Sequence, residues 1–194
     1  QLGSTYMQFI PIVERHAQTQ SVTDFSVPAE GYGKFLVDVF HEWYEHDVGK
    51  IYVSQFDNLL GQWLGYPSTT CVHQPTCGQS LVTEANGDVY ACDHFVYPEY
   101  KVGNLTQQPL TEIVLSSKQQ QFGLEKSQKL TALCRHCEFR KLCYGGCPKH
   151  RFVSLENEPN PHNYLCASYR YFFEQTAPYM QAMARQIRLH PSAA

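Results

Sequence analysis

Eight cysteines are the residues of this 194-residue chain best suited to chemistry, and they are unevenly placed. None precedes Cys71 and none follows Cys166. Their spacing reads C-x5-C-x14-C, then 41 other residues, then C-x2-C-x5-C-x3-C, and then 18 residues before the last cysteine. Clustered thiols of this kind form disulfides, bind zinc or hold iron–sulfur clusters. The spacing has to decide among these three chemistries.

Disulfides and zinc fit the pattern less well than iron–sulfur clusters do. Disulfides stabilise small secreted domains with little core, whereas 43% of this chain is hydrophobic. Zinc prefers paired C-x2-C knuckles or mixed Cys/His sets, and the only knuckle here is Cys134 with Cys137. His73, His94 and His136 lie near cysteines in the sequence, but none stands at an offset typical of a zinc ligand. Zinc as a substitute metal, and a structural zinc-binding domain as a function, stay open.

Two [4Fe–4S] clusters account for all eight cysteines, because each cluster takes four thiolates. The run from Cys134 to Cys147 need not serve one cluster, since the last cysteine of such a run in two-cluster ferredoxins ligates the other cluster. Gly145 and Gly146 would let the backbone turn sharply beside a cluster, and Pro148 would stiffen the exit. The spacing therefore predicts two clusters and leaves the pairing of the cysteines open.

The remaining composition excludes several classes of protein. There are 15 Lys and Arg against 18 Asp and Glu, a net charge of -3, so no surface for nucleic acid or an anionic membrane is expected. Apolar runs such as 35–40 are too short to span a bilayer. The chain opens at Gln1 on an apolar run, without a recognisable targeting segment, which predicts a piece of a longer protein. We expect a cytoplasmic location.

Hydrophobic periodicity predicts the elements that position these cysteines, beginning with a strand and a helix that together form a βα unit. The expected elements of the first part are, in order, a buried strand over 6–13 interrupted by Pro11, a loop over 14–30, an amphipathic helix from 34 to about 47, an extended stretch at 51–53 and a shorter helix over 56–64.

From about Gly65 onward the pattern is dominated by loops. Asn86-Gly87 between two β-favouring runs predicts a hairpin, because both residues tolerate positive φ. The expected elements of this part are the hairpin strands at 81–83 and 89–91, a helix from Pro109 to about Glu125, and a last helix from near Asn163 that bends or breaks at Pro178.

The cysteine pattern resembles that of the SPASM domain, the twin-cluster domain appended to certain radical S-adenosylmethionine enzymes. Within that group the chain is most similar to the anaerobic sulfatase-maturating enzymes, which include proteins called arylsulfatase regulators. The resemblance covers residues 6–170. It rests on the order Cys77, Gly87, Cys92, on the run from Cys134 to Cys147 with Cys166 downstream, on the extra Cys71, and on the segments 87–93 and 101–105.

The resemblance implies an α+β fold with three parts. Residues 1–65 would be the last βα unit of a radical S-adenosylmethionine partial barrel plus a linker helix. Residues 66–170 would form a loop-rich SPASM domain with a β-hairpin and flanking helices, and 171–194 a C-terminal helix and tail.

The resemblance also implies a division of the cysteines that their spacing does not decide. One cluster, nearer the active site, would be held by Cys71, Cys77, Cys92 and Cys147. The outer cluster would be held by Cys134, Cys137, Cys143 and Cys166.

Asp93, directly after Cys92, is implied to take a proton from the substrate. Removing a hydrogen atom from the Cβ of Cys or Ser leaves a radical that must also lose a proton and an electron, so a carboxylate beside an electron-accepting cluster suits the reaction. The alternative is that Asp93 is an exposed turn residue or an acceptor for loop amides.

The implied activity is oxidation of a Cys or Ser of a client sulfatase to formylglycine, with an electron-transfer protein as a second partner. In that family S-adenosylmethionine and a third [4Fe–4S] cluster are bound through C-x3-C-x2-C, a triplet that this sequence lacks. The chain alone is therefore expected to be inactive. A radical enzyme that modifies ribosomal peptides remains an alternative, and the choice between a Cys and a Ser client stays open.

Overall fold

The computed structural model describes residues 3–190, which form two compact units of an α+β fold. The first unit contains residues 3–69 together with 164–190, and the second contains residues 70–163. Among the described residues, no helix combines the length and apolar character needed to cross a membrane. The limits 1–65, 66–170 and 171–194 expected from the sequence stay a prediction.

Three helices and one pair of short strands make up the first unit. Its elements are β1 (Tyr6–Met7), α1 (Gly31–His46), β2 (Tyr52–Val53), α2 (Ser54–Leu64) and α7 (Cys166–Leu189), with β1 parallel to β2. The two predicted helices and the extended stretch at 51–53 are confirmed.

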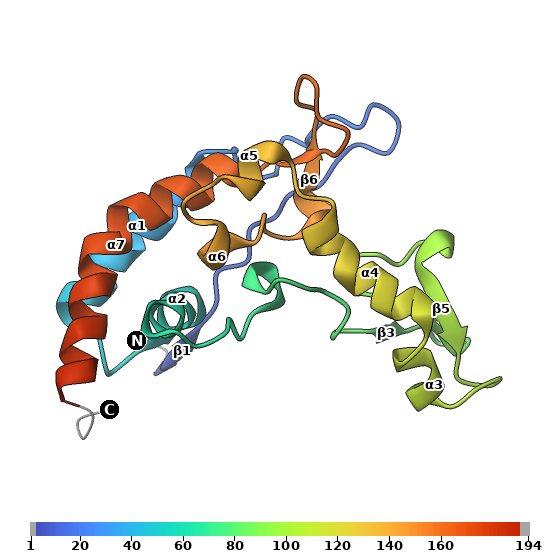
Figure 1. The fold of residues 1–194 in the computed structure, drawn as a ribbon, viewed down its shortest axis with the longest axis horizontal. Helices are drawn as coiled ribbons and strands as arrows, with labels where there is room; N and C mark the ends of the chain where they lie inside the picture. Colours follow the sequence, from blue (N-terminus) through green and yellow to red (C-terminus); the bar gives the residue numbers. More distant parts are fainter. Residues whose placement is uncertain (1–2, 191–194) are drawn as a thin grey trace. The chain divides into compact units, whose positions relative to one another are not determined.

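Aromatic rings fill the core of this unit, where α1 and α2 both pack against α7 (Figure 1). Phe40 and Phe56 are fully buried, and their ring centroids lie 5.4 Å apart, edge to face. Phe172 of α7 is 5.8 Å from Phe56. The apolar stripe of each helix is therefore buried against the other two, as amphipathic periodicity requires.

Gly33 allows α1 and α7 to approach each other closely. Its amide donates to the hydroxyl of Ser168 at 2.8 Å, and that hydroxyl donates to the carbonyl of Ala29 at 2.7 Å. A Cβ on Gly33 would lie 2.5 Å from the Ser168 carbonyl oxygen and 2.6 Å from its Cα. Both atoms are backbone and cannot rotate away, so the two helices would have to separate.

We expect Gly33→Ala to lower the free energy of unfolding by about 1–3 kcal/mol, because overpacking outweighs the better helix propensity of alanine. Gly61→Ala in α2 is the matched control, since no atom lies within 4 Å of a Cβ there. That control should be neutral or up to about 1 kcal/mol more stable. Urea unfolding of both variants measures the difference, and equal stabilities would contradict the close approach.

One prediction in this unit is wrong, and a second is wrong in part. Regular strand covers only Tyr6–Met7 of the predicted run 6–13, and Tyr6, Ile10 and Ile12 are exposed rather than buried. The run has one two-residue partner, and Pro11 lacks an amide for a ladder.

The last helix begins at Cys166 rather than near Asn163, and it runs through Pro178 without a break. Phe173 before the proline and Met180 after it are both buried. Burial on both sides of the proline compensates for the one helical hydrogen bond that it removes.

The second unit is built from short elements. They are β3 (Val82–Thr83), β4 (Asp88–Tyr90), β5 (Lys101–Asn104), α3 (Leu110–Val114), α4 (Ser117–Gln128), α5 (Ala132–Arg135), α6 (Arg140–Cys143), β6 (Arg151–Val153) and β7 (His162–Asn163).

The hairpin expected around Asn86-Gly87 is confirmed. Strands β3 and β4 pair antiparallel, and Gly87 has a φ of +84°. Strand β5, which was not predicted, adds to the other edge of β4. Asn104 at its end donates to Asp88 at 2.7 Å and thereby fixes the turn between the strands.

The single helix expected from Pro109 to Glu125 is wrong, because α3 ends at Val114 and α4 starts at Ser117. The hydroxyl of Ser116 accepts a hydrogen bond from the Gln119 amide and caps a new helix. Serine side chains compete with the helical backbone in this way, so the apolar stripe continues while the helix does not.

Candidate functional site

One face of α4 is the platform on which the loop carrying Cys77 lies. The Cys77 amide donates to the Gly123 carbonyl at 3.1 Å, and a Cβ on Gly123 would come within 2.6 Å of the Cys77 carbonyl oxygen. One turn earlier, the Gln119 side chain donates to Gly78 at 2.8 Å and to Ala91 at 3.1 Å. Gln119 thereby ties the segments before and after the hairpin to the same helix.

Lys126 extends this platform to Cys71. Its ammonium group donates to the carbonyl oxygen of Cys71 and, at 3.1 Å, to that of Val72. The side chain is only 1% exposed, and burial lowers the pKa of its ammonium group, while the neighbouring thiols of Cys77 and Cys147 act in the opposite direction. A buried cation is thus held within electrostatic range of several cysteines.

Electrostatic interactions connect four cysteines of this unit, with Cys147 interacting with each of the other three: Cys71, Cys77, Cys92 and Cys147. Burial raises the pKa of the Cys147 thiol to about 11, and its neighbours Cys77 and Cys71 raise it further. Burial also raises the pKa of the Cys92 thiol to about 12, with Cys147 among the lesser contributors. Cys147 is therefore close to the three cysteines that precede it by many residues in the chain. We call these four residues the first cysteine set.

The backbone before Cys147 turns through three consecutive left-handed residues, Tyr144, Gly145 and Gly146, with φ between +48° and +73°. The sharp turn expected from the two glycines is confirmed. Arg151 holds this turn, donating to the carbonyl oxygens of Tyr144 at 2.9 Å and Gly145 at 3.1 Å. This turn lies directly before Cys147, which interacts electrostatically with Cys77 and Cys71 of the first cysteine set.

Cys134, Cys137 and Cys143 lie on the short segment that contains α5 and α6. The hydroxyl of Thr131 caps α5 by accepting from the Cys134 amide at 3.3 Å. The same hydroxyl is 3.1 Å from Nδ1 of buried His162, which lies 3.7 Å from the Cys134 sulfur. Cys166, implied by the resemblance as the fourth member, is the first residue of α7 in the other unit. We call these four the second cysteine set.

Asp93 is exposed and directly contacts a cysteine of the first set. Its Oδ1 lies 3.1 Å from the Cys92 sulfur and accepts the His94 amide at 3.0 Å. One carboxylate oxygen accepts a hydrogen bond from the loop, while the carboxylate as a whole faces solvent. The geometry is therefore compatible both with a proton acceptor and with an exposed turn residue that accepts from loop amides. Across the same loop, Nδ1 of His94 is 3.9 Å from the Cys147 sulfur.

The positive charges near the cysteines indicate which metal group these residues fit. Within residues 3–190, no three side chains of His, Cys, Asp or Glu are grouped so that they could hold a metal ion. Lys126 and Arg151 are both close to cysteines, and neither has an ion pair with a carboxylate in the described part of the chain. A [4Fe–4S] cluster with four thiolates is anionic, so it would neutralise these cations. The site residues fit such a cluster.

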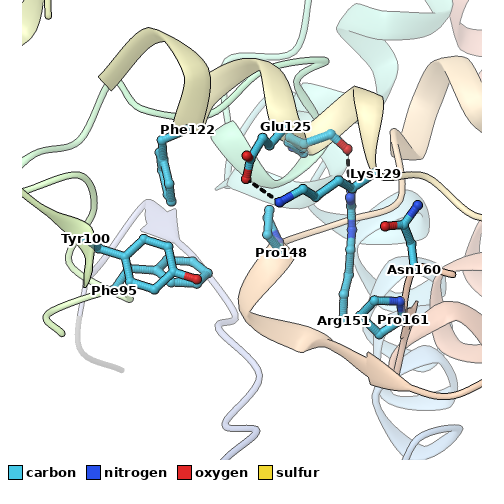
Figure 2. Close-up of a pocket in the computed structure, with 10 residues that line it drawn as sticks. Phe95, Tyr100, Phe122, Glu125, Lys129, Pro148, Arg151, Asn160 and Pro161 are labelled. Carbon is cyan, nitrogen blue, oxygen red and sulfur yellow. Dashed lines mark hydrogen bonds and ion pairs between the residues drawn. The ribbon is translucent and has the colours of Figure 1, made fainter. Parts of the chain in front are cut away.

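A pocket of about 310 Å³ adjoins this region within the second unit. Figure 2 shows Phe95, Tyr100 and Phe122 on one side and Arg151 on the other, with Pro148 between. The rings of Phe95 and Tyr100 lie 4.7 Å apart. The pocket leads from an aromatic wall to the guanidinium beside the Cys147 turn.

Comparisons with known proteins show what this chain is similar to. Residues 71–138 match the family model of the SPASM domain, described as an iron–sulfur cluster-binding domain. A serine-type anaerobic sulfatase-maturating enzyme from Bacteroides thetaiotaomicron is 42% identical over 94% of this chain and 47% of its own length. The chain is thus similar to part of an anaerobic sulfatase-maturating enzyme and includes a segment that matches the SPASM domain.

Two further similarities extend to the other client type and to three-dimensional structure. A cysteine-type anaerobic sulfatase-maturating enzyme from Clostridium perfringens is 31% identical over 94% of this chain and 50% of its own length. A solved structure described as native anSMEcpe with bound AdoMet and Cp18Cys peptide superimposes with a TM-score of 0.80 at 32% identity, over 94% of this chain and 51% of that chain. The chain spans about half the length of the curated relatives it matches.

Two buried histidines of the second unit are expected to make the metal-free chain sensitive to acid. Burial lowers the pKa of both His73 and His150 to about 4, against about 6.5 in an unfolded chain. The unfolded state therefore binds more protons below pH 6.5. We expect the free energy of unfolding to fall as pH drops from about 6.5 to 4, by up to about 3 kcal/mol for each histidine.

Replacing His150 with Gln should remove about half of this pH dependence and leave the contribution of His73. Denaturant unfolding of the metal-free wild type and variant between pH 4 and pH 7 measures both slopes. Parallel pH profiles for the two proteins would contradict the assignment to His150.

Three contributors to the site were not identified from the sequence: Lys126, Arg151 and His162. On a helical period, Gln119, Gly123 and Lys126 fall on one face of α4, but a polar face normally indicates solvent. Arg151 and His162 lie on strands too short to give a periodic signal. Gly123, within that polar face, was the only sequence feature that indicated a close backbone contact.

Proposed function

We propose that this chain is the auxiliary-cluster part of a cytoplasmic radical S-adenosylmethionine enzyme that oxidises a Cys or Ser of a client sulfatase to formylglycine. S-adenosylmethionine and a third [4Fe–4S] cluster would be bound elsewhere in the intact protein, through a C-x3-C-x2-C triplet that these 194 residues do not contain. The chain alone would then be inactive. An electron-transfer protein would receive the electrons.

The observation that carries this proposal is the placement of Asp93 within 3.1 Å of the Cys92 sulfur. Formylglycine formation removes a proton as well as electrons from the same side chain, so an acceptor for each has to lie nearby. The solved relative that bears a peptide and AdoMet in its description supports a peptide substrate for the family. Relatives described as serine-type and as cysteine-type both match, so the client residue is left open in the proposal.

In the proposed site, the first set would hold one [4Fe–4S] cluster through Cys71, Cys77, Cys92 and Cys147. The second set would hold the other through Cys134, Cys137, Cys143 and Cys166. When bound, such clusters supply one-electron acceptors beside the substrate. The electrostatic interactions of Cys147 with Cys71, Cys77 and Cys92 support this pairing of the first set.

The residues of this chain would hold and move the proton. The Asp93 carboxylate accepts the proton that leaves the thiol or hydroxyl of the substrate side chain after a hydrogen atom has been removed from its Cβ, and its exposed position lets it pass that proton on to solvent. The amide of His94 holds one carboxylate oxygen at 3.0 Å. Lys126 and Gln119 hold the loops that carry Cys71 and Cys77, so the ligands keep their positions while charge changes beside them.

The proposal is tested with the intact protein under anaerobic conditions, using S-adenosylmethionine and two sulfatase peptides that differ only in Cys or Ser at the target position. Mass spectrometry detects formylglycine, and an aldehyde-reactive probe confirms it. Conversion of at least one peptide supports the proposal. Turnover of S-adenosylmethionine without aldehyde in either peptide, together with crosslinking of a ribosomal peptide, would favour the alternative family of peptide-modifying enzymes.

A further inference from the structure

Two cations, the buried Lys126 and the half-buried Arg151, lie among the cysteines. Lys126 is 1% exposed, and its ammonium group donates only to backbone carbonyl oxygens, those of Cys71 and Val72. The adjacent carboxylate, Glu125, pairs instead with Lys129 at 2.7 Å. In the described part of the chain, Lys126 therefore has no anionic side chain as partner. Burying a charge in this way is costly unless an anion compensates it.

Arg151 is the second cation, and it touches the first. Its guanidinium group donates to the backbone carbonyl of Lys126 at 2.6 Å, an interaction that Figure 2 marks with a dashed line. The same group donates to Tyr144 at 2.9 Å and Gly146 at 3.4 Å, the residues that follow Cys143 and precede Cys147. Arg151 is thus fixed by backbone acceptors and has no freedom to move toward solvent.

The surroundings of Arg151 include cysteines of both sets. Cys77 and Cys147 of the first set and Cys134 and Cys143 of the second all interact with it electrostatically. Lys126 interacts with the first set alone, through Cys77, Cys147 and Cys71. The two cations also repel each other. The fold accordingly holds two positive charges close together, near cysteines of both sets. Strong negative charge on both cysteine sets would compensate them.

We propose that Lys126 and Arg151 form a cationic bridge shared by the two clusters, which stabilises their reduced states and so raises their reduction potentials. This inference rests on the proposed iron–sulfur function. One-electron reduction adds one negative charge to a cluster, and a fixed cation within a few ångström favours that change. The electron comes from the substrate radical in the proposed reaction and from dithionite in the test below.

The test uses the 194-residue chain, reconstituted anaerobically with iron and sulfide and titrated with dithionite while the reduced clusters are followed by electron paramagnetic resonance. Lys126→Met removes one charge and keeps a long apolar stem. We expect at least a tenfold fall in the equilibrium constant for reducing the first cluster, which corresponds to 59 mV for a one-electron couple. Arg151→Gln should lower this constant for both clusters.

Two variants separate charge from packing. Lys126→Arg retains the cation and should keep the equilibrium constant within about threefold of the wild type. Lys129→Met removes a cation from the C-cap of α4, where it is exposed and paired with Glu125, and should leave the constant unchanged within about twofold. Wild-type constants in both Lys126→Met and Arg151→Gln would overturn the inference while leaving the cluster assignment intact.

Loss of iron in the variants is equally decisive. If Lys126→Met and Arg151→Gln bind no iron but Lys126→Arg binds the wild-type amount, the clusters require the charge and the bridge is supported. If Lys126→Arg also fails to bind iron, Lys126 serves packing and the bridge is refuted. A wild-type chain that takes up zinc and no iron would instead refute the proposed function itself.

Discussion

We expect Asp93→Asn to abolish the formylglycine formation proposed for the intact protein and to leave both proposed clusters in place. General acid–base groups contribute about 10²–10⁴-fold to such reactions, so we expect the rate to fall by at least a hundredfold. Asparagine keeps an oxygen that accepts the His94 amide, now 3.0 Å from the carboxylate, but it cannot take up a proton. The structural contribution of Asp93 is thereby retained and its chemical contribution removed.

Iron content and formylglycine yield are measured on the same preparation. Glu99→Gln is the control, because it neutralises another exposed carboxylate of the same unit that contacts no cysteine in the described structure. It should keep wild-type yield. Wild-type turnover by Asp93→Asn would refute the proton-acceptor role, and loss of iron in that variant would assign Asp93 to loop structure instead.

We expect the removal of Cys77 and Cys147 together to cost no more iron than the removal of either one. The two thiols are electrostatic neighbours, and in the proposed pairing both hold the first cluster, so losing one ligand or two would eliminate the same cluster. We expect Cys77→Ala, Cys147→Ala and the double variant each to retain about four irons of about eight. Combining Cys77→Ala with Cys143→Ala should remove nearly all of the iron.

These double variants test which cysteines share a cluster, and they do so without assigning spectral signals to either cluster. If Cys147 instead served the cluster of the contiguous run 134–147, its combination with Cys77→Ala would eliminate both clusters. The combination of Cys143→Ala with Cys147→Ala would then retain about four irons, whereas our pairing predicts almost none. Iron analysis after anaerobic gel filtration distinguishes the two outcomes.

Local signals predicted much of the fold. The helices α1 and α2 follow from their apolar stripes, and the hairpin follows from Asn86-Gly87, because these features depend on residues a few positions apart. The helix break at Ser116 and the continuity through Pro178 did not follow. Each depends on a balance between one hydrogen bond and burial elsewhere in the fold, which a local pattern does not contain.

In the candidate site, too, local sequence predicted some features, and others depend on tertiary structure. Metal binding by the cysteines stays a prediction from their spacing and from the resemblance, and the charges around them came only from the structure. Lys126 looks like a solvated residue on a polar helix and is buried against Cys71. Arg151 lies 17 residues from Cys134 and reaches both sets only because the Tyr144–Gly146 turn folds back on it. Such contacts depend on tertiary structure.

The central claim is that the eight thiols of this chain bind two [4Fe–4S] clusters. The most direct measurement is quantitative iron, acid-labile sulfide and zinc analysis of the chain purified and reconstituted without oxygen, together with its absorbance near 400 nm. We predict about eight iron atoms and about eight sulfides per chain, with a broad band at about 400 nm. Stoichiometric zinc with no iron uptake would contradict the claim and leave a structural zinc-binding domain in its place.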